Sequence, residues 1–136
     1  MSLTLDLRDA VTAAPSRPAS APRSDLEVIA AMVREGASVL DVGCGDGELL
    51  QLLQRKRGAK ARGMELSQAG VNACVGKGLS VVQGDADRDL VDYPDNAFDY
   101  VILSKTIQAV RHPRAVLKEL IRIADHCLQV SGVFGN

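Results

Sequence analysis

Two kinds of apolar pattern alternate along the chain. Short continuous apolar runs, of the length and composition of buried strands, are separated by segments in which apolar residues recur every three or four positions. The predicted strands lie at 39–42, 61–65, 79–82, 98–104 and 127–130, and the predicted helices at 24–33, 48–57, 68–77 and 113–124. Strands that alternate with helices in this way predict an α/β fold built on a parallel sheet.

Several predicted helices have recognisable end signals. The sequence from Ser24 to Glu27 matches a capping box, and Ser67 is a plausible N-cap for helix 68–77. Gly58 is placed to end helix 48–57, and Pro113 suits the first turn of the last helix. Turns are expected at 83–87 and 93–96. The inward positions are expected at Val71, Cys74 and Val75 in the third helix, and at Val116, Leu117, Leu120, Ile121 and Ala124 in the last.

The first predicted strand runs directly into a turn that contains Gly43, Gly45 and Gly47. Glycine adopts positive φ readily and has no Cβ, so a ligand can lie against the backbone of such a turn. A strand, a glycine turn and a helix N-terminus together form a nucleotide cradle at the carboxyl end of a parallel sheet. The alternative is a glycine-rich turn that binds no ligand.

The spacing of these glycines narrows the choice of ligand. A dinucleotide fingerprint is G-x-G-x-x-G, whereas this turn is G-x-G-x-G and follows Asp41 at the strand end. A carboxylate there repels a pyrophosphate but suits a cationic ligand such as a sulfonium or an amine. A nicotinamide-dependent oxidoreductase is therefore disfavoured. The stretch 41–47 resembles motif I of class I S-adenosylmethionine-dependent methyltransferases.

Later strand ends supply further candidate site residues. Glu65 ends the second strand, where a doubly wound sheet offers a carboxylate to a ribose; the alternative is a solvated acid. Ser104 ends the fourth strand and should face the cofactor. By the methyltransferase resemblance, Asp85 accepts from the adenine amino group and the Ala86 N–H meets a ring nitrogen; the alternative is an ordinary turn. The expected cofactor site comprises Asp41, Gly43, Cys44, Gly45, Gly47, Glu65, Leu66, Asp85, Ala86 and Ser104.

No catalytic residue is assigned. Methyl transfer from a sulfonium is an in-line displacement that gains most from positioning, so it does not require an acid–base pair. If the acceptor needs a base, Lys105 and His112 are the candidates. A lone histidine just before a helix is more often a cap or a surface residue.

Composition limits the remaining function classes. The 136 residues are enough for one domain, with 46% hydrophobic and 24% charged residues. The net charge is −1, the bases are scattered and aromatic residues make up 3%, so nucleic acid is not expected as a partner. Because three prolines fall among small residues at 13–23, residues 1–23 are expected to form a flexible tail before a cofactor-binding domain at 24–136.

The three cysteines and the N-terminal segment indicate the cellular location of the protein. Cys44, Cys74 and Cys127 have neither paired nor metal-binding spacing, and we expect them to be buried thiols with no metal site. Unpaired cysteines of this kind are typical of proteins in a reducing cytosol. The start of the chain has no basic segment followed by an apolar one, and no run reaches 18 apolar residues. The expectation is a cytoplasmic protein that is neither exported nor membrane-spanning.

Five segments together resemble the MetW family of methionine biosynthesis proteins, namely 25–27, 39–50, 84–87, 98–104 and 106–110. The similarity spans about 24–125. It implies an S-adenosylmethionine-binding, methyltransferase-like protein of methionine biosynthesis that works with a homoserine O-acyltransferase. A small-molecule methyl acceptor is implied but not established. The alternative is a non-catalytic regulator or partner of that acyltransferase.

The resemblance also implies the architecture. We expect a Rossmann-like three-layer αβα sandwich with a mainly parallel five-stranded sheet in the order 3-2-1-4-5. The family continues beyond the fifth strand, whereas the residues here at 129–136 depart from its pattern and stop. The usual C-terminal hairpin is therefore expected to be lacking. An uncovered edge strand invites pairing, so a homodimer through the fifth strand is a further hypothesis.

Overall fold

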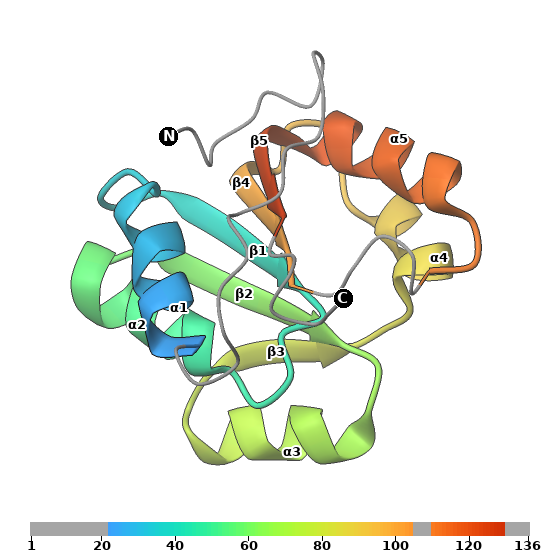
Figure 1. Cartoon of the computed structure of the whole chain (residues 1–136). Coiled ribbons are helices and arrows are strands. Elements are labelled where there is room, and N and C mark those ends of the chain that lie inside the picture. Colours follow the sequence, from blue (N-terminus) through green and yellow to red (C-terminus); the bar gives the residue numbers. More distant parts are fainter. Residues whose placement is uncertain (1–21, 105–109, 130–136) are drawn as a thin grey trace.

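The computed structural model describes residues 22–104 and 110–129. Helices and strands alternate, as the hydrophobic pattern predicts (Figure 1). The helices are α1 (Pro22–Ala31), α2 (Glu48–Arg57), α3 (Gln68–Gly76), the short α4 (Ala86–Asp89), the 3₁₀ turn η1 (Leu90–Asp92) and α5 (Pro113–Ile123). The strands are β1 (Ser38–Val42), β2 (Lys60–Glu65), β3 (Ser80–Gln83), β4 (Phe98–Leu103) and β5 (Ala124–Gln129).

The five strands form one parallel sheet in the order β3-β2-β1-β4-β5, which confirms the expected topology. Val42 at the end of β1 lies beside Met64 on β2 and Leu103 on β4. Glu65 pairs with Gln83 at the end of β3. The glycine turn, Glu65, Asp85 and Ser104 therefore all follow strand ends at one edge of the sheet, where ligands of such folds bind.

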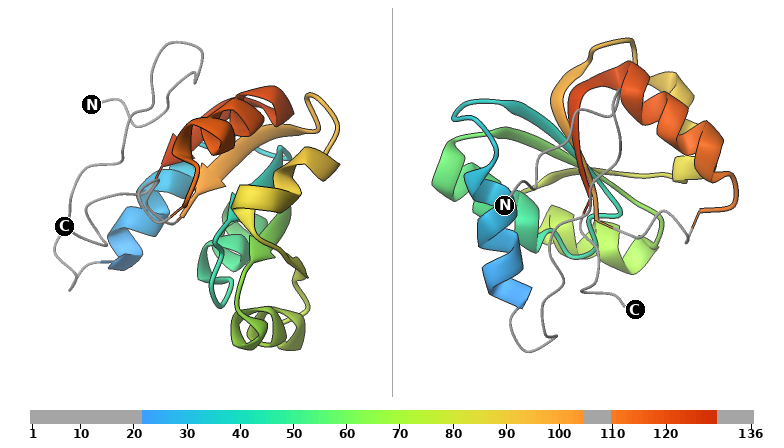
Figure 2. Two further views of the ribbon diagram at one scale, coloured as in Figure 1. Left: turned by 90° about the vertical axis from the view of Figure 1, so that its right-hand side faces the viewer. Right: turned by 45° about the horizontal axis from the view of Figure 1, so that its top comes forward.

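Helices cover both faces of the sheet. Figures 1 and 2 show α1, α2 and α3 on one face and α5 with α4 on the other. Val39 packs with the first set, alongside Ile29 and Leu53, whereas the next residue, Leu40, packs with Leu120 on the second. This alternation places an apolar core on each face. The three-layer αβα sandwich is confirmed.

The local end signals are largely confirmed. Gly58 ends α2 with a φ of 57°, and its N–H bonds back to Gln54 and Leu53. Ser67 caps α3, because its side chain accepts a hydrogen bond from Gly70 N–H at 3.0 Å. Pro113 stands in the first turn of α5. These signals act within a few residues, which is why the sequence reveals them.

Other boundaries differ from expectation. Helix α1 begins at Pro22, so Ser24 lies inside it and is not its N-cap. Val75, which was expected to face inward, is 61% exposed, and α3 buries only Val71 and Cys74. Ala124 begins β5 directly after α5, so the strand starts three residues earlier than predicted. The expected turn at 83–87 contains the start of α4.

Some expectations fall outside the described residues. The tail lies almost wholly in 1–21, and both the candidate base Lys105 and the segment after Gln129 are also outside. The missing hairpin and the homodimer stay predictions. Within 22–104 and 110–129, no helix is long and apolar enough to cross a membrane. The same residues contain no group of three or more His, Cys, Asp or Glu side chains that could hold a metal ion.

Candidate functional site

The glycine turn is fixed to the end of β2 through its backbone. The N–H groups of Gly43 and Cys44 both donate to Met64 O, at 2.8 and 3.2 Å. Gly43, Gly45 and Gly47 all have positive φ, of 80°, 59° and 86°. The turn therefore requires the backbone freedom that the sequence analysis assigned to its glycines.

The glycines at 45 and 47 serve different purposes. A Cβ built on Gly45 meets nothing within 4 Å, so the backbone of this residue faces open space. A Cβ on Gly47 would overlap the side chains of Leu79 and Cys74. Gly47 was expected to let a ligand approach the turn. Its lack of a side chain instead allows the turn to pack closely on α3 and the residue before β3.

Glu65 holds the glycine turn in place through hydrogen bonds to the backbone. Its side chain is 4% exposed, and its two carboxylate oxygens accept from Gly45 N–H at 2.8 Å and from Ser67 N–H at 3.0 Å. The expected role was to bind ribose hydroxyls. A carboxylate oxygen accepts more than one hydrogen bond, so a sugar role is compatible with these contacts. The structure adds that Glu65 connects the glycine turn to the start of α3.

Asp41 and Ser104 meet between β1 and β4. The Ser104 hydroxyl donates to Asp41 Oδ1, and Asp41 is 1% exposed. No group among the described residues bonds Asp41 Oδ2. Burial raises the pKa of Asp41 to about 7, the Ser104 hydrogen bond opposes that rise, and the nearby Glu65 charge adds to it. The site thus contains a buried carboxyl whose ionisation a neighbouring cation would favour.

A cavity of about 420 Å³ opens beside the glycine turn, at the carboxyl edge of the sheet. This volume lies within the range of small-molecule sites, about 300–1,000 Å³. Its apolar wall comes from the ends of β1, β2 and β4 and from the residues that follow them. Its polar wall comes from the start of α4 and from Arg111. The lining residues are Val42, Gly43, Met64, Leu66, Gly84, Asp85, Ala86, Asp87, Leu103, Val110 and Arg111.

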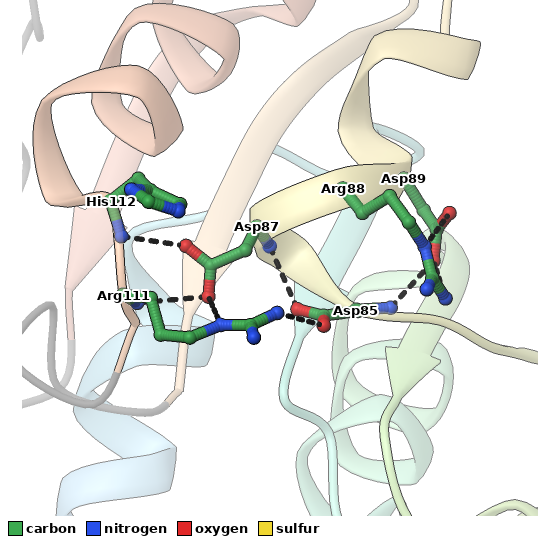
Figure 3. A network of polar contacts seen from close by, with 6 residues as sticks. All are labelled: Asp85, Asp87, Arg88, Asp89, Arg111 and His112. Carbon is green, nitrogen blue, oxygen red and sulfur yellow. Dashed lines mark hydrogen bonds and ion pairs between the residues drawn. The ribbon is translucent and has the colours of Figure 1, made fainter.

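The polar wall is a network of charged groups (Figure 3). Asp85 Oδ1 accepts from Asp87 N–H at 2.9 Å, and Asp85 Oδ2 accepts from Arg111 Nη2 at 3.1 Å. Asp89 Oδ2 accepts from Asp85 N–H at 2.7 Å. Asp85, which was expected to accept a hydrogen bond from an adenine amino group, is thus already paired with Arg111. The Arg111 side chain is 72% exposed, so its ion pair with Asp85 is weak and a ligand group can replace it.

The ten expected cofactor residues divide into three groups. Gly43, Leu66, Asp85 and Ala86 line the cavity, whereas Asp41, Cys44, Gly47 and Glu65 are buried and support the turn. Gly45 and Ser104 are partly exposed but are not among the lining residues of the cavity. His112 is exposed, and its N–H donates to Asp87. Sequence reasoning missed Asp87 and Arg111, although the alternating acids of Asp85, Asp87 and Asp89 were a visible signal.

Comparison with known proteins identifies the family of this chain. A family model described as methionine biosynthesis protein MetW matches residues 23–136. The chain belongs to the MetW family. It is 33% identical over 112 residues to the bifunctional methionine biosynthesis protein MetXA/MetW of Rhodopirellula baltica, covering 76% of this chain and 18% of that protein. It is 30% identical over 95 residues to ajmaline N-methyltransferase of Rauvolfia serpentina, covering 64% of this chain and 32% of that enzyme.

Solved structures share the fold of this MetW-family chain. A SAM-dependent methyltransferase from Aquifex aeolicus superposes with a TM-score of 0.63 at 28% identity, covering 74% of this chain and 58% of that one. A complex of the Haloferax volcanii Trm112 methyltransferase activator with a putative methyltransferase gives 0.65 at 26% identity, covering 73% and 46%. The chain thus spans about half the length of these structures and less of the curated relatives. The fold is Rossmann-like and methyltransferase-like.

Proposed function

We propose that this MetW-family chain binds S-adenosylmethionine across the glycine turn and in the adjoining cavity, and serves methionine biosynthesis as a methyltransferase-like protein. The observation that carries the proposal is the bare backbone of Gly45. It faces open space at the carboxyl edge of the sheet, and Gly43 of the same turn lines a cavity of about 420 Å³. The SAM-dependent methyltransferase from Aquifex aeolicus, which shares the fold, supports the choice of cofactor.

The residues present fit this ligand. Asp41 is a buried carboxyl with an oxygen that no described residue bonds, and a ligand with a sulfonium and an ammonium group supplies positive charge. The carboxylate oxygens of Glu65, next to the glycine turn, are the acceptors for hydrogen bonds from the sugar hydroxyls. Asp85 and the Ala86 N–H stand at the cavity wall for the base. The apolar side chains of Met64 and Leu103 form the opposite wall, as flat aromatic ligands require.

The chemistry proposed is transfer of a methyl group to a small molecule that is not yet identified. S-adenosylmethionine supplies the activated methyl group when bound. The chain's own contribution is positioning, since a displacement of this kind gains most from correct placement of its reactants. His112 is a candidate base only if the acceptor must lose a proton, and its exposed side chain is consistent with a surface or capping residue.

A second function is favoured by one specific relative. The Rhodopirellula baltica protein combines MetXA and MetW in one bifunctional chain. We therefore keep the alternative that this chain is a non-catalytic regulator or partner of a homoserine O-acyltransferase, with the cofactor site acting as a sensor. A nicotinamide-dependent oxidoreductase is opposed by the glycine spacing and by the buried carboxyl of Asp41. The cytoplasmic location and the homodimer stay predictions.

Calorimetric titration tests the proposal. The purified chain is titrated separately with S-adenosylmethionine, S-adenosylhomocysteine and NADH. The proposal predicts binding of the two sulfur ligands and no binding of NADH. Turnover with candidate acceptors then separates the catalytic function from the regulatory one. Binding of NADH alone would contradict the proposal and favour the oxidoreductase.

A further inference from the structure

Asp87 connects two segments that are 24 residues apart in the sequence. Its Oδ2 accepts from Arg111 N–H at 2.9 Å, and its Oδ1 accepts from His112 N–H at 2.8 Å. Figure 3 shows the carboxylate of Asp87 extending from α4 to the residues that precede α5. Both oxygens of one carboxylate thus hold two consecutive backbone N–H groups of a distant segment.

This contact gives the N-cap residue of α5 an acceptor for its N–H and places a negative charge beside the start of the helix. His112 is the N-cap residue of α5 and makes no side-chain cap hydrogen bond. The N–H groups at the start of a helix need acceptors, and negative charge is favoured there. The side chain of Asp87 is 7% exposed, although Arg111 and His112, which donate to it, are exposed residues. Its hydrogen bonds hold the pKa of Asp87 below its usual value.

The two segments that Asp87 joins both contribute to the polar wall of the cavity. Asp85 and Ala86 contribute from the start of α4, and Val110 and Arg111 contribute from the residues before α5. The Arg111 side chain adds a second connection, from Nη2 to Asp85 Oδ2 at 3.1 Å and from Nε to Asp87 Oδ2 at 3.7 Å. That guanidinium is 72% exposed and flexible, so the two short hydrogen bonds from the backbone to Asp87 are the firmer of the two connections.

We propose that Asp87 is a positioning residue for the ligand cavity. Its carboxylate holds the residues before α5 against the start of α4, and so fixes the shape of the polar wall that receives the base of an adenosyl ligand. The proposal rests on the proposed function. It assigns to Asp87 an effect on ligand affinity that acts through the backbone of residues 110–112, not through reaction chemistry.

The test compares Asp87→Ala and Asp87→Asn with a matched control, Asp92→Ala. Asp92 carries the same charge, is exposed and lies in η1, just after α4. Calorimetry with S-adenosylhomocysteine should show about tenfold weaker binding for Asp87→Ala, since two charge-assisted hydrogen bonds are lost. Asp87→Asn keeps only one acceptor oxygen and should lie between Asp87→Ala and the wild type. Asp92→Ala should bind as the wild type does.

A spectroscopic measurement separates positioning from a general loss of stability. In ¹⁵N-labelled protein without ligand, the amide resonances of Arg111 and His112 should move in both Asp87 variants, whereas those of Leu50 and Leu53 in α2 should not. Arg111→Ala keeps both backbone hydrogen bonds, so it should lower affinity less than Asp87→Ala does. Arg114→Ala, which removes an exposed charge from the first turn of α5, is its control.

The outcomes are distinct. If the wild type binds no sulfur ligand, the proposed function fails and this inference fails with it. If the wild type binds S-adenosylhomocysteine and Asp87→Ala binds it equally well, the inference alone is overturned. It is also overturned if the resonances of Arg111 and His112 do not move, or if Asp92→Ala weakens binding as much as Asp87→Ala.

Discussion

The carboxylate of Glu65 accepts a hydrogen bond of 2.8 Å from the backbone N–H of Gly45. One residue at the end of β2 thereby sets the position of the glycine whose backbone faces open space. The same carboxylate accepts from Ser67 N–H, so it also joins the turn to α3. The shape of the turn at the proposed ligand site therefore depends on a single buried side chain.

Glu65→Ala should lower both ligand affinity and stability. Each backbone N–H that loses a carboxylate acceptor costs on the order of 1.5–3 kcal/mol at most. Calorimetry with S-adenosylhomocysteine and thermal unfolding without ligand measure the two effects. Glu35→Ala, which removes an exposed acid, is the control and should change neither. Unchanged affinity in Glu65→Ala would remove Glu65 from the site.

Substitution of the two glycines should separate the requirements of the ligand from those of the fold. Gly45→Val places a side chain in the open space and should abolish binding. The left-handed backbone costs this variant about 1–2 kcal/mol, so it should still fold. Gly47→Ala should unfold at a lower temperature even without ligand, because its Cβ would overlap Leu79 and Cys74. Thermal unfolding and calorimetry on both variants check this, and a Gly45→Val protein that binds normally would contradict it.

Affinity for a cationic ligand should depend on pH through Asp41. Its pKa is raised to about 7, so the carboxyl is largely neutral below that pH and ionised above it. Binding of S-adenosylmethionine should therefore strengthen as pH rises through 7 and then level off. Asp41→Asn should bind weakly at every pH. Calorimetry from pH 5.5 to 8.5 measures the profile, and a wild-type affinity that does not change across this range would argue against a role for Asp41.

The same carboxyl should make the protein without ligand less stable as pH rises. Between the ordinary value of 3.8 and about 7, the folded state keeps a proton on Asp41 that the unfolded state has lost. Stability from this group is thus complete below pH 3.8 and lost by about pH 7, at about 1.4 kcal/mol per pH unit. The free energy of unfolding of the wild type, relative to Asp41→Asn, should fall over this range. A difference that rises with pH would contradict the assignment.

The three cysteines should be unreactive in the folded protein. All are free and buried, and burial raises the pKa of Cys127 to about 12 and that of Cys44 well above its usual value. Since the thiolate is the reactive form, alkylation by iodoacetamide at pH 8 should be slow until the chain unfolds. Mass spectrometry of alkylated protein measures this. Rapid labelling of Cys44 would mean that the glycine turn opens in solution.

The sequence was sufficient for features that depend on local patterns. Alternating strands and helices predicted the parallel sheet, whereas its strand order came from the family resemblance. Gly58 and Ser67 marked helix ends through bonds within a few residues. The four-residue helix α4 is too short for a helical repeat to be visible, so the sequence predicted only a turn there. Ala124 was assigned to the last helix but begins β5, because no turn separates α5 from β5.

The candidate site was predictable in its location but not in its contacts. All strand-end residues lie at one edge of the sheet, as parallel topology requires. The contact of Asp87 with Arg111 and His112, and that of Arg111 with Asp85, join residues more than 20 positions apart. No periodicity encodes such pairs. The separate role of Gly47, likewise, depends on where α3 and Leu79 pack in three dimensions.

Mapping a bound ligand onto the backbone tests the central claim most directly. Titration of ¹⁵N-labelled protein with S-adenosylhomocysteine should shift the amide resonances of Gly43, Gly45 and Ala86, which lie along the turn and the cavity. The resonances of Glu27 and Gln51, which line a separate cavity between α1 and α2, should stay in place. Saturable shifts in the first set would support the proposed site. Shifts confined to the second set, or none at saturating ligand, would contradict it.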